Sequence, residues 1–251
     1  HLIIDNMEDG LSAQENVSEE GVSEDCTMYE GQIKAANAVE MVRQIAETAR
    51  DDKEIKSLFD SAAEAGISKE EQYKEFQDAL SLIQYTRQCV FLTGKAGTGK
   101  STFLRYICEN IKKKHVVLAP TGIAAINAGG STLHSFFKLP FHPLLPDDPN
   151  LSLQRGRIHE FFRYTKPQRK LLEELELIII DEISMVRADI IDAVDRILRV
   201  YSRNLREPFG GKQLLLVGDV FQLEPVVKGD EREILNRFYP TPCFFSARVF
   251  N

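Results

Sequence analysis

The stretch Cys89–Thr102 reads C-V-F-L-T-G-K-A-G-T-G-K-S-T. Its first four residues, Cys89–Leu92, are apolar and predict a short buried strand, while the apolar spacing that follows Thr102 predicts a helix. Between them, residues 94–101 match the G-x-x-x-x-G-K-[ST] pattern of a phosphate-binding loop. The alternative is a glycine-rich turn with an exposed lysine, and the strand and helix on either side argue against it.

The residue types of this loop suit a polyphosphate ligand. Glycines allow backbone N–H groups to approach phosphates closely, and the N-terminus of the following helix adds a partial positive charge. Lys100 supplies a full charge for the β- and γ-phosphates, and the Ser101 hydroxyl is placed to ligate Mg²⁺. We therefore predict ATP and Mg²⁺ as ligands, with nucleotide contacts from Gly94, Gly97, Thr98, Gly99, Lys100, Ser101 and Thr102.

The negative charge of the chain is concentrated at its start. The net charge of the 251 residues is −7, but residues 2–33 hold nine of the 38 acidic residues and no Lys or Arg, which leaves 29 acidic against 31 basic residues elsewhere. We predict a disordered acidic tail over 1–33, a helical extension over 34–67 and an ATPase domain over 68–251. The acidity of the tail does not argue against a nucleic-acid partner for the remainder.

The four cysteines are far apart and form neither a C-x-x-C pair nor a metal-binding spacing. A reducing, intracellular compartment is expected: cytoplasm or nucleoid in a bacterium, nucleus or mitochondrion in a eukaryote. No apolar run is long enough to span a membrane, and no signal peptide is visible, so no membrane partner is predicted. The chain starts with His1 rather than methionine, which indicates a fragment.

Strands with nearly continuous apolar character alternate with helical patterns after residue 68. This alternation predicts an α/β fold, a parallel sheet with helices on both faces. The predicted strands are Cys89–Leu92, His115–Ala119, Leu177–Ile180, Gln213–Val217 and Cys243–Phe245. One predicted helix begins at Ser68. Four others cover Ser101–Lys114, Ile123–Ala128, Arg187–Tyr201 and Glu231–Phe238.

Polar residues follow three of these strands, where ligands bind in such sheets. Lys100 and Ser101 follow the first strand, and Asp181 follows the third, where its carboxylate is expected to hold Mg²⁺ together with Ser101. The neighbouring Glu182 is the predicted general base for the attacking water. After the fourth strand, Asp219 and Gln222 follow, and the Gln222 amide can hydrogen-bond the γ-phosphate and the water.

Two basic segments invite a nucleic-acid interpretation. Residues 151–172 contain one acid and six basic residues, with Phe161, Phe162 and Tyr164 among them. Basic residues bind phosphates and aromatic rings stack on unpaired bases, so we predict DNA contacts at Arg155, Arg157 and Arg163. The alternative is a solvated helix face with two core phenylalanines. The second segment, Lys112–Lys114, is better explained by the C-terminus of a helix than by a DNA patch.

The order of motifs resembles that of the PIF-type DNA helicases of superfamily one. The motifs are G-K-A-G-T-G-K-S-T, A-P-T-G-I-A-A, S-T-L-H-S-F-F, I-I-I-D-E-I-S-M-V and V-G-D-V-F-Q-L-E-P-V, within about residues 70–251. The resemblance implies a RecA-like motor domain and ATP-driven 5′-to-3′ movement on single-stranded DNA. It further implies forked or structured DNA substrates and roles in DNA repair, recombination and telomere maintenance.

The resemblance also assigns roles to individual residues. It implies catalytic roles for Lys100, Glu182 and Gln222, and it implies that Mg²⁺ is bound by Ser101 and Asp181. Gln77 is expected to contact the adenine edge, with a surface glutamine as the alternative. A small inserted subdomain is expected at about 139–165. The residues implied to lie along the DNA path are Thr121, Gly122, His134 and Phe137.

Two other functional classes remain open from the sequence. One is an ATP- and DNA-binding module without unwinding activity. The other is an ATPase loader of the AAA type, against which the motifs Gly218–Gln222 and Thr121-Gly122 argue. The family's later motifs, with the arginines that a second RecA-like domain contributes, are absent from these 251 residues. We therefore expect this stretch alone to bind Mg·ATP weakly and not to unwind duplex DNA.

Overall fold

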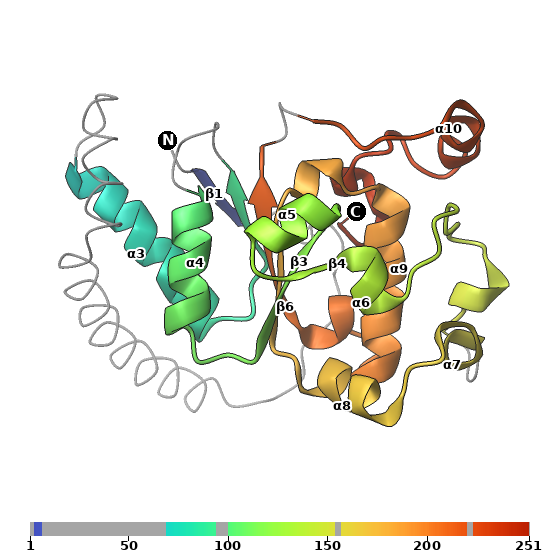
Figure 1. Cartoon of the computed structure of the whole chain (residues 1–251), viewed down its shortest axis with the longest axis horizontal. Helices are drawn as coiled ribbons and strands as arrows, with labels where there is room; N and C mark the ends of the chain where they lie inside the picture. Colours follow the sequence, from blue (N-terminus) through green and yellow to red (C-terminus); the bar gives the residue numbers. More distant parts are fainter. Residues whose placement is uncertain (1–2, 7–68, 94–99, 154–156, 220–222, 251) are drawn as a thin grey trace, which may run out of the picture.

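The computed structural model describes residues 3–6, 69–93, 100–153, 157–219 and 223–250 (Figure 1). Several predictions lie outside these residues: most of the acidic tail, the helical extension, Gly94, Gly97, Thr98, Gly99, Arg155 and Gln222. None of the described helices is long and apolar enough to cross a membrane.

The described strands form one sheet in the order β1-β2-β6-β5-β3-β4. The strands after β1 pair in parallel, as predicted. Their bounds are β2 Val90–Thr93, β3 His115–Ala119, β4 Ser131–Thr132, β5 Leu177–Ile180 and β6 Gln213–Gly218. β1, Ile3–Asn6, adds an antiparallel edge strand against β2, within the segment predicted as an acidic tail.

The predicted fifth strand, Cys243–Phe245, is wrong. Cys243 makes only an isolated bridge with Arg187, and Phe244–Ser246 form a 3₁₀ helix, η5. Two prolines, Pro240 and Pro242, precede this segment, and their missing N–H groups cannot contribute to a ladder. The apolar residues that suggested a strand are used in packing, because the Phe244 ring lies 5.6 Å from the ring of Phe91.

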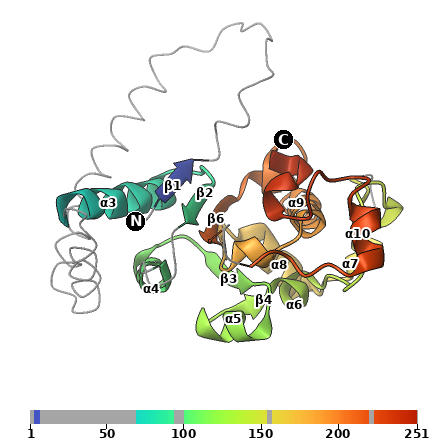
Figure 2. The same ribbon diagram turned by 90° about the horizontal axis from the view of Figure 1, so that it is seen from above.

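Helices cover both faces of the sheet, as predicted, and Figure 2 shows α4 and α9 on opposite sides. α3 (Lys69–Tyr85) and α4 (Lys100–Asn110) pack on the face that includes Leu177, Ile179, Leu215 and Val217. α9 (Ala188–Tyr201) packs on the face that includes Ile178, Ile180, Leu214 and Leu216. The remaining helices are α5 Gly122–Asn127, α6 Leu133–Phe137, α7 Arg157–Phe162, α8 Lys166–Glu174 and α10 Gly229–Leu235.

α4 ends four residues before the predicted helix end, and the three lysines follow it. Lys113 Nζ donates to Thr86 O at 2.5 Å and to Gln213 Oε1 at 2.8 Å, and burial lowers the pKa of this lysine to about 8. Lys114 Nζ lies 2.9 Å from Glu174 Oε2. These contacts hold α4 to the amino ends of the strands, which gives Lys113 and Lys114 structural partners.

Three buried aspartates on α9 each accept hydrogen bonds from the backbone of a different segment. Asp189 Oδ2 accepts from Leu144 N at 2.9 Å, and Asp195 Oδ1 accepts from Phe209 N at 2.6 Å. Asp192 accepts from the hydroxyl of Tyr239 and from the backbone N–H groups of residues 248 and 249, at 2.8–3.1 Å. α9 therefore anchors the insert, the loop before β6 and the C-terminal segment.

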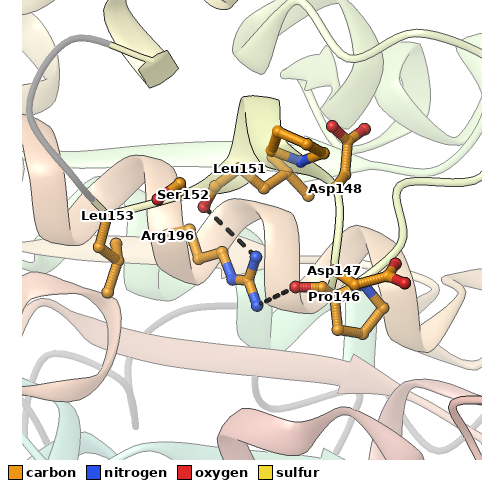
Figure 3. Close-up of a pocket in the computed structure, with 8 residues that line it drawn as sticks. Pro146, Asp147, Asp148, Leu151, Ser152, Leu153 and Arg196 are labelled. Carbon is orange, nitrogen blue, oxygen red and sulfur yellow. Dashed lines mark hydrogen bonds between the residues drawn. The ribbon is translucent and has the colours of Figure 1, made fainter.

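The predicted insert at 139–165 shares the core of α9 instead of having a separate core. Its buried residues, which include Leu144, Leu151 and Phe162, belong to the same apolar cluster as α9. Arg196 of α9 donates to Pro146 O at 2.8 Å and to Leu151 O at 3.3 Å, across a cavity of about 470 Å³ (Figure 3). The insert is thus attached to α9 through Asp189 and Arg196.

Candidate nucleotide and DNA site

The three strand ends that the sequence singled out lie side by side. β6 pairs in parallel with both β2 and β5, so Thr93, Gly218 and Ile180 end neighbouring strands at the same edge. Lys100 begins α4 just after the predicted phosphate loop, and Asp181 and Glu182 follow β5 directly. Figure 1 shows α4 beside these strands.

Asp181 is fixed by the backbone around it. Its N–H donates to Leu118 O at 2.8 Å, and its Oδ1 accepts from Glu182 N at 2.9 Å. Burial raises the pKa of the Asp181 carboxyl, and the hydrogen bond from Glu182 N and the charge of Lys100 oppose that rise. A bound cation would also favour the charged form of this carboxylate.

Glu182 occupies a turn with left-handed backbone dihedrals, φ 52° and ψ 43°. Such a conformation costs a non-glycine residue about 1–3 kcal/mol and is found most often at functional sites. Burial raises the pKa of the Glu182 carboxyl; the charges of Asp181 and Asp219 raise it further, while Lys100 lowers it. A carboxylate with a raised pKa is suited to accept a proton near neutral pH.

The end of β6 packs closely against the turn that follows Glu182. A Cβ on Gly218 would lie 3.0 Å from Ile183 Cγ2 and 3.1 Å from Ile183 N, so a larger residue would push the turn. Asp219, the next residue, is 7% exposed. The sequence analysis gave Gly218 no role of its own, although a glycine at the end of a buried strand is a signal for a close backbone approach.

The oxygen donors of Asp181 and Ser101 suit Mg²⁺ better than a metal ion that takes all of its ligands from the protein. In the described part of the chain no three His, Cys, Asp or Glu side chains are grouped to hold a metal ion. Mg²⁺ keeps several waters and commonly takes only one or two protein oxygens plus phosphate oxygens. Asp181 and Ser101 are the protein oxygens that the sequence predicted for it.

Thr121, Gly122 and His134 lie on the helices at the β4 edge of the sheet. Thr121 Oγ1 accepts from Ala124 N at 3.3 Å and caps α5, while Gly122 is exposed and no atom lies within 4 Å of a Cβ placed there. His134 is half-buried on α6. The structure therefore leaves these residues within reach of a ligand, and their contact with DNA stays a prediction.

Phe137, which the resemblance places along the DNA path, has a buried side chain, so DNA contact through its ring is not supported. Phe137 is 0% exposed, and its ring belongs to the core around α9. Leu133 and Phe137 are four residues apart in α6, so both face the core, and His134 lies on another side of the helix. The backbone carbonyl of Phe137 is also occupied, because it accepts from the hydroxyl of Tyr164.

The basic segment places its aromatic residues and its arginines in different environments. Phe162 and Tyr164 are buried in the core, whereas Phe161 is exposed, so only one of the two phenylalanines matches the alternative of core residues. Arg157 and Arg163 are exposed, and Arg163 Nε donates only to the carbonyl of Glu160 among the described contacts of its side chain. Gln77 is half-buried on α3. DNA contact by the arginines and adenine contact by Gln77 stay predictions.

The family model for the PIF1-like helicases matches residues 67–239. The chain belongs to this family. Two helicases from Saccharomyces cerevisiae are 38% identical: RRM3 over 167 residues, covering 64% of this chain and 22% of RRM3, and PIF1 over 182 residues, covering 69% and 19%. The chain thus spans about a fifth of the length of these curated relatives.

Solved structures of Bacteroides Pif1 show the same fold and confirm the RecA-like α/β prediction. Pif1 bound to single-stranded DNA is 51% identical, with a TM-score of 0.62, and covers 70% of this chain and 38% of that one. Pif1 in complex with ADP-AlF4 is 50% identical, with the same TM-score and the same coverages. The PIF1-like helicase family therefore accounts for both the sheet and the motif order of this chain.

Proposed function

We propose that the protein is an ATP-dependent DNA helicase whose motor domain couples ATP hydrolysis to 5′-to-3′ movement on single-stranded DNA in genome maintenance. The observation that carries this proposal is the meeting of Lys100, Asp181, Glu182 and Asp219 at one sheet edge. Burial raises the pKa of the Asp181 and Glu182 carboxyls there, and the charge of Lys100 opposes the rise at both. Relatives bound to single-stranded DNA and to ADP-AlF4 support the same two ligands here.

Each residue has a specific task in this proposal. Lys100 binds the β- and γ-phosphates, and Asp181 and Ser101 hold Mg²⁺, which neutralises phosphate charge when it is bound. Glu182 orients the attacking water and accepts its proton, and Gln222 hydrogen-bonds that water and the γ-phosphate. Positioning and charge stabilisation supply most of the rate in phosphoryl transfer, so the fixed backbone around Asp181 and Glu182 matters as much as their carboxylates.

The proposed DNA ligands are single-stranded and forked DNA. A relative has been solved at forked double-stranded DNA, with 51% identity, a TM-score of 0.63 and coverage of 70% of this chain and 40% of that one. Exposed Arg157 and Arg163 provide positive charge for phosphates. The described cysteines, Cys89, Cys108 and Cys243, are free thiols, in keeping with a reducing compartment: cytoplasm or nucleoid, nucleus or mitochondrion.

Phosphate release by the intact protein tests the proposal, measured with and without single-stranded DNA. Lys100→Ala should weaken both Mg·ATP binding and turnover by about 10- to 100-fold, since a hydrogen bond to a charged group contributes about 1.5–3 kcal/mol. Lys112→Ala, an exposed lysine beyond the other end of α4, is the control and should change neither. Turnover that DNA does not stimulate would contradict a motor, and unchanged affinity in Lys100→Ala would remove Lys100 from the site.

The arginines of the insert give a separate prediction about DNA affinity. Replacing Arg155, Arg157 and Arg163 with alanine should weaken single-strand binding and reduce the slope of log K against log salt by about 2, because each lost phosphate contact accounts for about 0.7. Binding is measured by fluorescence anisotropy between low and high salt. A variant that removes three other exposed charges, Arg87, Lys112 and Arg206, is the control. Equal slopes in the two variants would favour a solvated face.

A further inference from the structure

Phe141 is an exposed aromatic residue at the start of the insert. It is 84% exposed, although it is one of the large apolar side chains of the chain. Its ring lies against the His134 imidazole, with centroids 5.2 Å apart and planes 11° apart. One face of the Phe141 ring is thus covered by a parallel ring, and the high exposure leaves the other face open to solvent.

His134 holds the phenyl ring on a rigid base. It lies on α6, whose first turn is capped by Thr132 Oγ1, which accepts from Ser135 N at 3.1 Å. Burial lowers the pKa of His134, with a further contribution from the charge of Arg187, while the charge of Asp189 opposes it; the lowered pKa favours the neutral imidazole. A neutral, flat ring favours parallel stacking, and a ring that is already ordered loses little freedom when a ligand binds.

Lys138 and Arg163 bring positive charge to the segment that carries this aromatic pair. Lys138 follows α6, three residues before Phe141, and its Nζ donates to Arg163 O at 3.3 Å. The contact brings the exposed Arg163 of the insert next to Lys138. α5, which carries the exposed residue Gly122, adjoins the same β4 edge in both views (Figures 1 and 2). A flat apolar face beside cations matches single-stranded nucleic acid, where phosphates bind cations and bases stack on rings.

We propose that the open face of the Phe141 ring stacks against a base of single-stranded DNA, with the His134 imidazole as its support. This inference rests on the proposed DNA binding and names a residue that the sequence motifs did not identify. A base on Phe141 would extend a stack of rings that starts at His134, and every base has a π-face, so the contact would not depend on sequence.

The test uses Phe141→Ala in the intact protein. Stacking contributes about 1–3 kcal/mol per base, which corresponds to a loss of affinity for oligo-dT of about 5- to 150-fold. The salt slope should stay the same, because no phosphate contact is lost. Phe141→Trp should restore the affinity for oligo-dT. When 2-aminopurine is placed in the oligonucleotide, its fluorescence should be quenched by the wild type and not by Phe141→Ala. Phe245→Ala, at a 48% exposed phenylalanine on η5, is the matched control.

The failures of the two proposals are distinguishable. A wild-type protein that does not bind single-stranded DNA would overturn the proposed function and this inference with it. Wild-type binding together with a change of less than twofold in Phe141→Ala would overturn the inference alone. The inference also fails if Phe141→Trp stays as weak as Phe141→Ala while both variants keep the wild-type melting temperature. If Phe141→Ala kept the wild-type DNA affinity but changed the molecular mass measured by light scattering, the ring would instead belong to a contact between copies of the protein.

Discussion

Glu182→Gln is expected to lower ATP turnover by the intact protein about 10²- to 10⁴-fold, the usual contribution of a general base. The amide keeps the shape of the carboxylate and cannot accept the proton of the attacking water. Affinity for Mg·ATP should stay near the wild-type value, because Lys100, Ser101 and Asp181 are unchanged. Turnover is measured under saturating single-stranded DNA, and affinity with a fluorescent ATP analogue.

Glu233→Gln, at an exposed position on α10, is the control for the loss of one carboxylate and should leave turnover unchanged. Turnover of Glu182→Gln within a few-fold of the wild type would show that another group accepts the proton. Loss of nucleotide affinity in the same variant would instead show that Glu182 contributes to ground-state binding.

The same substitution should stabilise the protein in the absence of nucleotide. The pKa of Glu182 is raised above its ordinary value of 4.5, so folding favours its protonated form, and that stability is lost as pH rises through the folded pKa. Glutamine removes this loss of stability, so the difference in melting temperature between the variant and the wild type should grow as the pH rises above 4.5. A difference that does not change with pH would contradict this prediction.

Of the substitutions proposed for this protein, Asp192→Ala is expected to cause the largest loss of folding stability. Asp192 is buried, and alanine would leave the Tyr239 hydroxyl and the backbone N–H groups of Arg248 and Val249 without their acceptor. A donor left unsatisfied costs about 1–3 kcal/mol, so three of them should lower the free energy of unfolding by on the order of 3 kcal/mol or more. That is a large part of the 5–15 kcal/mol typical of a folded domain.

Urea denaturation of the wild type and of three variants isolates this contribution. Tyr239→Phe removes only one of the three hydrogen bonds and should cost about 1 kcal/mol. Asp230→Ala, at an exposed aspartate on α10, should cost little. If Asp192→Ala were no less stable than Tyr239→Phe, the two backbone bonds would contribute nothing, and the C-terminal segment would be held by its apolar contacts alone.

The sequence predicted the buried centre of the sheet well and its edges poorly. β5 and β6 are buried on both faces, so their residues are apolar almost without interruption, and that pattern is unambiguous. β4 has only two residues, both polar, and offers no pattern to recognise. In Cys243–Phe245 the apolar residues were visible, but the effect of the two preceding prolines outweighed them.

The site was predictable in its residue types and not in its local geometry. Lys100, Asp181 and Glu182 were found because the chemistry needs those groups after those strands. The left-handed backbone of Glu182 could not be predicted, because a glutamate in the sequence does not indicate that conformation. The stacking of Phe141 on His134 depends on how residues 138–140 turn after α6. The burial of Phe137 could have been read from its spacing to Leu133, a pattern that the motif resemblance obscured.

The three aspartates of α9 determine how the surrounding segments are free to vary. α9 accepts hydrogen bonds from the backbone N–H groups of Leu144, Phe209, Arg248 and Val249. Every residue except proline carries this group. These hydrogen bonds therefore do not depend on which side chain the four residues carry, although the side chains of Leu144 and Phe209 are also buried in the core around α9. The polar attachment thus depends on the aspartates of α9 and on the Tyr239 hydroxyl that donates to Asp192, whereas the apolar attachment depends on the residues of the attached segments.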